Sequence, residues 1–150
     1  MLKFFQGKGD KMKSKKGYLI DPKNQSMTEV EIGNYKDIQK HLNCRVFSSA
    51  DYYLKREPFD RYGSLNDSLY IDDEGLLVDD EDTNFCFTFG ICDPIYSKGL
   101  IMGLNYDNGE TTDKPFVPME IYSDHIIFGW SAHKPKPRFE IRPFTLEDLK

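Results

Sequence analysis

Residues 17–43 read GYLIDPKNQSMTEVEIGNYKDIQKHLN, and they decide the fold class because two strand patterns, a turn and a helix pattern follow one another. Residues 17–20 form a short apolar run. In residues 27–32 apolar and charged side chains alternate, as they do in a half-buried strand. The DPKN sequence at 21–24 is typical of a turn, because proline presets φ and Asp and Asn support turn geometry. The two strands are therefore predicted to pair as a hairpin.

A helix is predicted directly after this hairpin. Tyr35, Ile38 and Leu42 recur at spacings of three and four, which places them on one helical face. Asn34 can cap the start of the helix, and Asn43 can end it in the left-handed conformation. A strand pair followed by an amphipathic helix favours an α+β fold.

The remaining chain is dominated by short strand patterns. They lie at residues 45–49, 68–71, 76–78, 84–90, 100–104, 117–122 and 125–130. The pair around Gly75 is predicted to form a bulged hairpin, and the last pair a hairpin over Ser123 and Asp124. The sequence lacks the βαβ alternation that would suggest a doubly wound sheet. We expect an α+β fold: a curved, mainly antiparallel sheet of about eight short strands with one main helix, residues 35–42, packed on one face.

Length and composition place the chain among globular proteins of the cell interior. A length of 150 residues fits one domain. No apolar run approaches the roughly 18 residues that cross a bilayer, and residues 1–16 lack the apolar core of a signal peptide. An odd number of cysteines, three in all, argues against a secreted disulfide scaffold. We therefore expect a cytoplasmic protein with no membrane partner.

The charge of the chain is unevenly distributed. Residues 1–16 carry six lysines and one aspartate, a formal charge of +5, so the remaining chain carries −10. This predicts a flexible basic tail at 1–16 before a single α+β domain at 17–150. The tail could solubilise the protein, fold back on the acidic body, or contact nucleic-acid phosphates. The lysines for such phosphate contacts are Lys8, Lys11, Lys13, Lys15 and Lys16.

Two acidic clusters stand close together in the chain. Their members are Asp72, Asp73, Glu74, Asp79, Asp80, Glu81 and Asp82. They could form a solvated turn and loop, or an acidic surface that binds a partner. A hard cation is the third alternative, but the spacing does not fit the calcium loop of an EF-hand. We expect no metal and no cofactor.

The segment 50–64 is rich in aromatic side chains. Tyr52, Tyr53, Phe59 and Tyr62 fall within it, together with the turn formers Pro58 and Gly63. These rings could be plugs of the core, or they could form an exposed binding surface. Interfaces favour Tyr and Phe, so the second alternative makes them candidate partner-binding residues.

Motifs for catalysis are missing from the sequence. No CxxC pair, nucleophile elbow or phosphate-binding loop occurs. Cys44 stands near His41, but nothing in the sequence orients such a pair for nucleophilic attack. We name no catalytic residue and lean against an enzyme, which would have to assemble its site from residues distant in sequence.

Five runs of residues resemble a known family. They are GYLIDPKNQSMTEVEI (17–32), NYKDIQKHLNC (34–44), DSLYIDDEGLL (67–77), KGLIMG (98–103) and DNGE (107–110). Together they resemble a small domain of unknown function carried by phages and mobile elements, over about residues 17–110. The segment 50–64, the basic tail and the end of the chain depart from that pattern. The resemblance implies a phage or viral origin and a location inside a host cell, and it brings no catalytic residues.

These observations give three functional hypotheses. The first is a non-enzymatic phage or viral accessory protein that binds a host protein, to counter a defence or redirect a host process. The second is a small-ligand-binding protein or an enzyme of unknown type. The third is a nucleic-acid-associated protein that uses its basic tail.

Overall fold

The computed structural model describes residues 14–74, 84–90 and 93–132, and it begins with the predicted hairpin. β1 (Lys15–Asp21) and β2 (Ser26–Ile32) pair antiparallel, with Lys15 opposite Ile32 and Asp21 opposite Ser26. The side chain of Asp21 accepts a hydrogen bond from the Asn24 backbone N–H at 3.3 Å, which closes the turn. Because β1 starts at Lys15, this strand includes the last two residues of the predicted basic tail.

The predicted helix is α1 (Tyr35–Leu42), and its ends are fixed by the residues expected to cap it. The Asn34 side chain accepts a hydrogen bond from the Asp37 backbone N–H, and the Asp37 carboxylate accepts one from the Asn34 N–H, both at 3.2 Å. This reciprocal pair is a capping box. Asn43 ends the helix in the left-handed conformation, with φ of 51°. Ile38 and Leu42 are buried, as their spacing predicts.

The main sheet has six strands and is mainly built from distant parts of the chain. Besides the hairpin it contains β3 (Phe47–Ser49), β4 (Leu65–Asp72), β6 (Gly99–Asn105) and β7 (Glu110–Thr111). The order is β2-β1-β6-β4-β3, with β7 paired to the end of β6, and every pairing is antiparallel. β6 is buried along almost its whole length, which explains its continuous apolar sequence.

The end of the described chain differs from the sequence prediction. Residues 117–122 and 125–130 were expected to form a hairpin, but the chain forms α2 (Met119–His125) and then β8 (Ile127–Trp130). β8 pairs antiparallel with β5 (Phe85–Thr88) in a separate two-stranded sheet. Apolar residues alternate before Ser123, so the pattern fits a strand. A seven-residue helix makes fewer than two turns, which is too short for its longer period to stand out.

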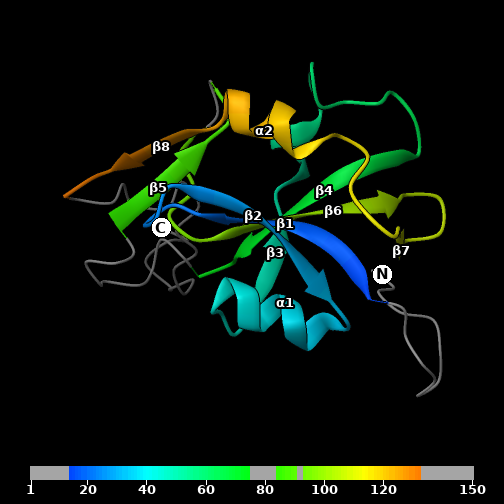
Figure 1. Ribbon diagram of the computed structural model, residues 1–150, viewed down its shortest axis with the longest axis horizontal. Helices are drawn as coiled ribbons and strands as arrows, with labels where there is room; N and C mark the ends of the chain where they lie inside the picture. The colour runs from blue at the N-terminus through cyan, green and yellow to red at the C-terminus, as the bar shows by residue number, and fades with distance from the viewer. Residues whose placement is uncertain (1–13, 75–83, 91–92, 133–150) are drawn as a thin grey trace, which may run out of the picture.

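Both faces of the main sheet are covered (Figure 1). α1 lies beneath the sheet, and α2 with the β5–β8 pair lies above it. The α1 side has a small core; its buried residues are Ile32, Ile38, Leu42, Tyr70, Leu100 and Met102. The opposite side has a larger core in which Leu69 and Ile101 of the sheet meet Phe59, Phe87 and Tyr122. The fold is therefore mixed α+β and antiparallel as expected, with a second covered face that was not expected.

A buried carboxylate ties the upper layer to the sheet. Asp67 of β4 is 1% exposed and accepts hydrogen bonds from the backbone N–H groups of Phe116 and Val117, at 2.7 and 3.1 Å. It also accepts one from the Tyr122 hydroxyl at 2.5 Å. Burial raises the pKa of Asp67 above its ordinary value of 3.8 despite these donors. Asp67 thus holds the chain that leads into α2.

No helix in the described parts of the chain is both long and apolar enough to cross a membrane.

Candidate functional site

An open groove of about 360 Å³ lies on the α1 side of the sheet, where α1 no longer covers it. α1 packs over Leu100 and Met102 of β6, while Leu104, on the same face two residues further, borders the groove. We call this hollow the Asp51 groove. Its lining residues are Phe47, Ser48, Ser49, Asp51, Ser68, Tyr70, Leu104, Tyr106 and Gly109.

Asp51 takes its place in the groove because β3 ends early. After Ser49 the chain leaves β4 and enters a short 3-10 helix, Asp51–Leu54. The last backbone hydrogen bond from this segment to β4 runs from the Ala50 N–H to the Leu69 carbonyl at 2.7 Å. The Asp51 carboxylate then accepts the Leu69 N–H at 3.1 Å and the Ser68 hydroxyl at 2.6 Å. A side chain therefore satisfies the β4 donor that a longer β3 would have paired.

Tyr106 closes the groove from the far end of β6. Its hydroxyl donates to the other oxygen of Asp51 at 2.5 Å. The ammonium of Lys55 lies 4.0 Å from the centre of the Tyr106 ring, within range of a cation–π contact. Burial and the neighbouring Asp51 raise the pKa of Tyr106, and burial raises that of Tyr70. Both phenols therefore keep their protons at neutral pH.

The hydrogen bonds of the groove make it a surface of acceptors. Ser68 and Tyr106 both donate their hydroxyl protons to Asp51; Ser68 is fully buried, whereas Tyr106 is 37% exposed and can offer its lone pairs to a ligand. Asp51 is in no ion pair within the described chain. The nine lining residues include no His, Cys, Lys or Arg, so nothing here activates Ser68 as a nucleophile. Among the described residues no three His, Cys, Asp or Glu gather as metal ligands.

The aromatic candidates of segment 50–64 divide between core and surface. Tyr53 and Phe59 are each 2% exposed, and Phe59 stacks on Tyr122 with ring centres 5.0 Å apart. Tyr52 is 64% exposed and rests on the ring of Tyr53, with centres 4.4 Å apart. Tyr52 directly follows Asp51 in the 3-10 helix but is not one of the residues that line the groove, and its ring packs against that of buried Tyr53.

Tyr62 is the most exposed of these rings, at 72%. Its hydroxyl donates to the Glu57 carboxylate, and its φ is 56°, in the left-handed region. The following chain runs beside the end of β6, since the Tyr106 N–H donates to the Ser64 carbonyl at 2.8 Å. Tyr62 thus leads into the same end of the sheet as Tyr106.

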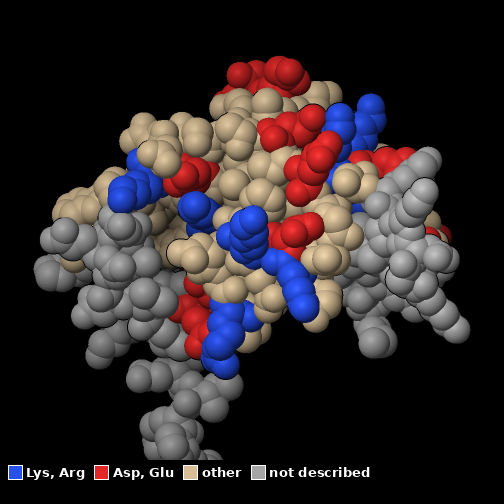
Figure 2. Space-filling view, turned by 60° about the horizontal axis from the view of Figure 1, so that its bottom comes forward, with Lys and Arg blue, Asp and Glu red and all other residues tan. Residues whose placement is uncertain are grey.

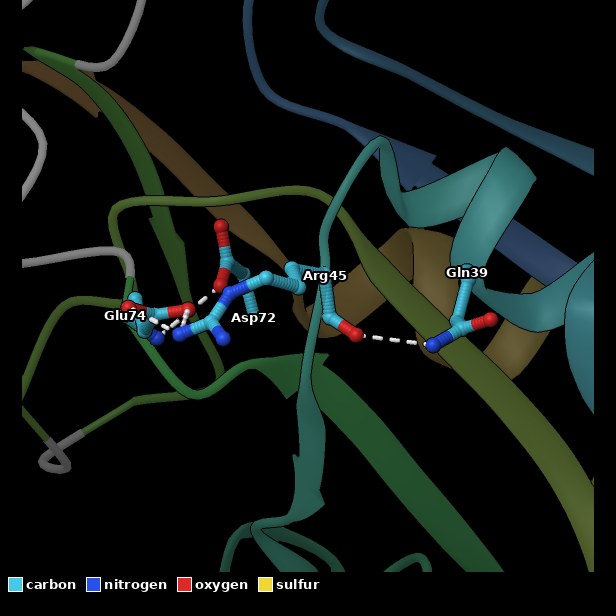
Figure 3. A network of polar contacts seen from close by, with 4 residues as sticks. All are labelled: Gln39, Arg45, Asp72 and Glu74. Carbon is cyan, nitrogen blue, oxygen red and sulfur yellow. Dashed lines mark hydrogen bonds and ion pairs between the residues drawn. The ribbon is translucent and has the colours of Figure 1, made fainter.

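Asp72 and Glu74 of the first acidic cluster form contacts within the fold (Figure 3). The Arg45 guanidinium contacts both Glu74 oxygens, at 3.0 and 3.1 Å, and the Gln39 amide donates to the Arg45 carbonyl at 2.7 Å. The Asp72 carboxylate accepts the Glu74 N–H at 2.9 Å. Asp73 is exposed, and its backbone N–H donates to the carbonyl of Val46, the residue before β3. The second cluster, Asp79, Asp80, Glu81 and Asp82, lies outside the described residues.

The structure separates the acidic candidates from the aromatic ones. Asp72 stands opposite Phe47 at one end of the β3–β4 pairing, whereas Asp51 contacts Ser68 four residues back along β4. At about 3.3 Å per strand residue, these positions are roughly 13 Å apart. Asp72 of the acidic set and Asp51, which precedes Tyr52 of the aromatic set, therefore lie at different ends of the β3–β4 pairing.

Two lysines of the predicted tail lie in the described part of the chain, and both contact acidic side chains of the folded domain. Lys15 pairs with Asp113 at 3.2 Å, and Lys16 with Glu29 at 3.4 Å. Lys8, Lys11 and Lys13 lie outside the described residues. Figure 2, which brings the α1 side forward, shows basic and acidic side chains interspersed over that face. No single sign of charge dominates the part of it that is described.

Sequence reasoning missed Asp51, Ser68 and Tyr106 as a group. They are 17 and 38 residues apart, and none belongs to a recognisable motif. Only the antiparallel pairing of β4 with β6 brings the three together, with Ser68 opposite Met102. A sequence signal was present in Asp51 alone, a polar residue directly after a strand pattern.

Comparisons with family models, with curated proteins and with solved structures find no match to this chain.

Proposed function

We propose that this protein is a non-enzymatic binding protein, and that its partner is another protein, held at the Asp51 groove and Tyr52. One observation carries the proposal: Tyr52, 64% exposed, directly follows Asp51, which lines an open groove. Tyr is enriched at binding hot spots because it offers a large, stiff ring with a polar end. A partner would cover a ring that the fold leaves in water.

Tyr106, which lines the groove, is itself 37% exposed and adds a second ring that a partner can cover. An open groove suits a protein segment, because a small ligand needs most of its surface enclosed.

The resemblance of residues 17–110 to a phage and mobile-element domain supports a host protein as the partner. On this proposal the protein acts in the host cytoplasm, by occupying its partner rather than by modifying it.

A nucleic-acid partner has less support. Lys15 and Lys16, two of the five lysines that would contact phosphates, already pair with Asp113 and Glu29. A phosphate would have to compete with those carboxylates, and binding would weaken steeply with added salt.

Affinity capture from host lysate, compared between matched variants, tests the proposal. Tyr52→Ser removes the exposed ring that follows Asp51. Tyr35→Ser removes a ring of similar exposure, 52%, from α1, which serves as the control. We expect a specific protein to be retained by the wild type and by Tyr35→Ser, and to be lost with Tyr52→Ser. Equal retention by both variants, or no retained protein, contradicts the proposed surface.

A further inference from the structure

In the Asp51 groove a carboxylate that no described basic side chain pairs with lies next to the partly exposed hydroxyl of Tyr106. From this geometry we infer that the groove receives a cationic side chain, arginine or lysine, from the bound protein. The inference rests on the proposed function and names the chemistry of the partner at that site.

The hydrogen-bond inventory of Asp51 leaves room for one more donor. A carboxylate offers about four lone-pair sites. Among the described residues, one oxygen accepts Ser68 and the Leu69 N–H, and the other accepts only Tyr106. The second oxygen therefore keeps one acceptor position, and the side chain of Asp51 is only partly buried. A donor entering from the groove can reach it.

The neighbouring groups favour a donor that carries positive charge. Tyr106, which is 37% exposed, presents oxygen lone pairs because its hydroxyl proton points to Asp51. A neutral amide or hydroxyl would gain hydrogen bonds here, but a cation gains the attraction of the carboxylate as well. No basic side chain of the described chain pairs with Asp51 to cancel that attraction.

Lys55 shows that this surface already attracts a cation. Its ammonium lies 4.0 Å from the Tyr106 ring centre, on a side chain that is otherwise exposed. That contact engages the ring and leaves the carboxylate unpaired. Lys55 therefore competes with an incoming cation by repulsion, and its removal should strengthen binding.

The shape of the groove fits one long side chain. Its volume of about 360 Å³ is near the lower end of ligand pockets, which span roughly 300–1,000 Å³. Phe47 and Leu104 supply apolar walls for the methylene stem, and Asp51 supplies the polar end for the charged head.

The test uses small probes on the full-length, ¹⁵N-labelled protein. N-acetyl-arginine amide, N-acetyl-lysine amide and N-acetyl-citrulline amide are titrated to about 50 mM at matched ionic strength, because an isolated side chain binds in the millimolar range. Citrulline keeps the shape of arginine without its charge. We expect saturable shifts of the Asp51, Ser68 and Leu69 amides with arginine or lysine, and binding of citrulline that is about fivefold weaker because its charge is missing. The comparison of arginine with lysine tells which cation the groove prefers.

Two variants with opposite expected effects sharpen the test. Asp51→Asn removes the charge, and we expect the arginine probe to bind about fivefold more weakly, the effect of one unit charge at contact distance in water. Lys55→Gln removes the competing charge, and we expect binding to strengthen by up to about fivefold. The Lys55 side chain is exposed and lies outside the hydrogen bonds of Asp51. Lys55→Gln therefore still tests the inference if Asp51→Asn fails to fold.

The outcomes separate this inference from the proposed function. Equal shifts with citrulline, or no shifts at all, overturn the inference, and a Tyr52-dependent partner would still uphold the proposed function. Saturable arginine binding without any Tyr52-dependent protein partner would support a cation site but contradict the protein-binding role.

Discussion

Replacing Asp67 by asparagine should destabilise the fold through one lost hydrogen bond. The carboxylate accepts donors from Phe116, Val117 and Tyr122 in a site that is 1% exposed. An asparagine keeps one acceptor oxygen for the Phe116 N–H, and its NH₂ can donate to the Tyr122 oxygen. The Val117 N–H then faces a second donor and has no acceptor. A buried, unsatisfied donor costs roughly 1–3 kcal/mol, so we expect a loss of about 2 kcal/mol.

Urea denaturation followed by circular dichroism measures this loss. A loss of 2 kcal/mol is a large fraction of the roughly 5–15 kcal/mol that stabilises a domain. Tyr122→Phe is the matched variant, since it removes one donor and leaves the other two bonds intact. Tyr122→Phe should lower the free energy of unfolding by roughly 1 kcal/mol.

The difference between wild type and Asp67→Asn should depend on pH with a definite sign. Burial raises the pKa of Asp67 in the folded state above its ordinary value of 3.8. The folded protein therefore holds the proton more tightly than the unfolded chain, and wild-type stability falls as pH rises from about 4 through the raised pKa. Asparagine lacks this dependence, so its disadvantage is largest near pH 4 and smaller at pH 7. A disadvantage that grows with pH, or a variant as stable as the wild type throughout, would refute the reasoning.

Three further predictions follow from local geometry. Gly99→Ala should cost roughly 1–3 kcal/mol in denaturation, because the new Cβ would lie 2.6 Å from the Phe87 ring, whereas Gly63→Ala, with open space around it, should change stability by less than about 0.5 kcal/mol. Asn43→Ala should cost about 1 kcal/mol at φ of 51°, while Asn43→Gly is nearly neutral by the same assay. Burial raises the pKa of Cys44 to about 11 from 9.0, so iodoacetamide should label native Cys44 at pH 8 about 100-fold more slowly than in urea, as mass spectrometry can measure.

Local patterns predicted the first third of the fold well. The hairpin and α1 are each specified within a few residues: a DPKN turn, one face of apolar side chains and asparagines at both ends of the helix. Such elements need no information from the rest of the chain. The prediction of α2 was wrong because its alternating apolar residues fit a strand, and only packing against Phe59 and Phe89 favours the helix.

The candidate site depended on pairing that the sequence does not reveal. Tyr52 and Tyr53 are adjacent and identical, yet one is 64% exposed and the other 2%. In a 3-10 helix neighbouring side chains point about a third of a turn apart, so burial is decided by which one meets the core. Asp51 meets Tyr106 only because β6 pairs with β4.

The most direct test of the account is the affinity of the captured partner for purified Tyr52→Ser and Tyr35→Ser, measured by calorimetry. The account predicts that Tyr52→Ser weakens binding at least tenfold, about 1.4 kcal/mol or more, as a hot-spot ring does. It predicts less than a twofold change, under about 0.4 kcal/mol, for Tyr35→Ser. Unchanged affinity for Tyr52→Ser, with loss in Tyr35→Ser, would place the interface on α1 and contradict the central claim.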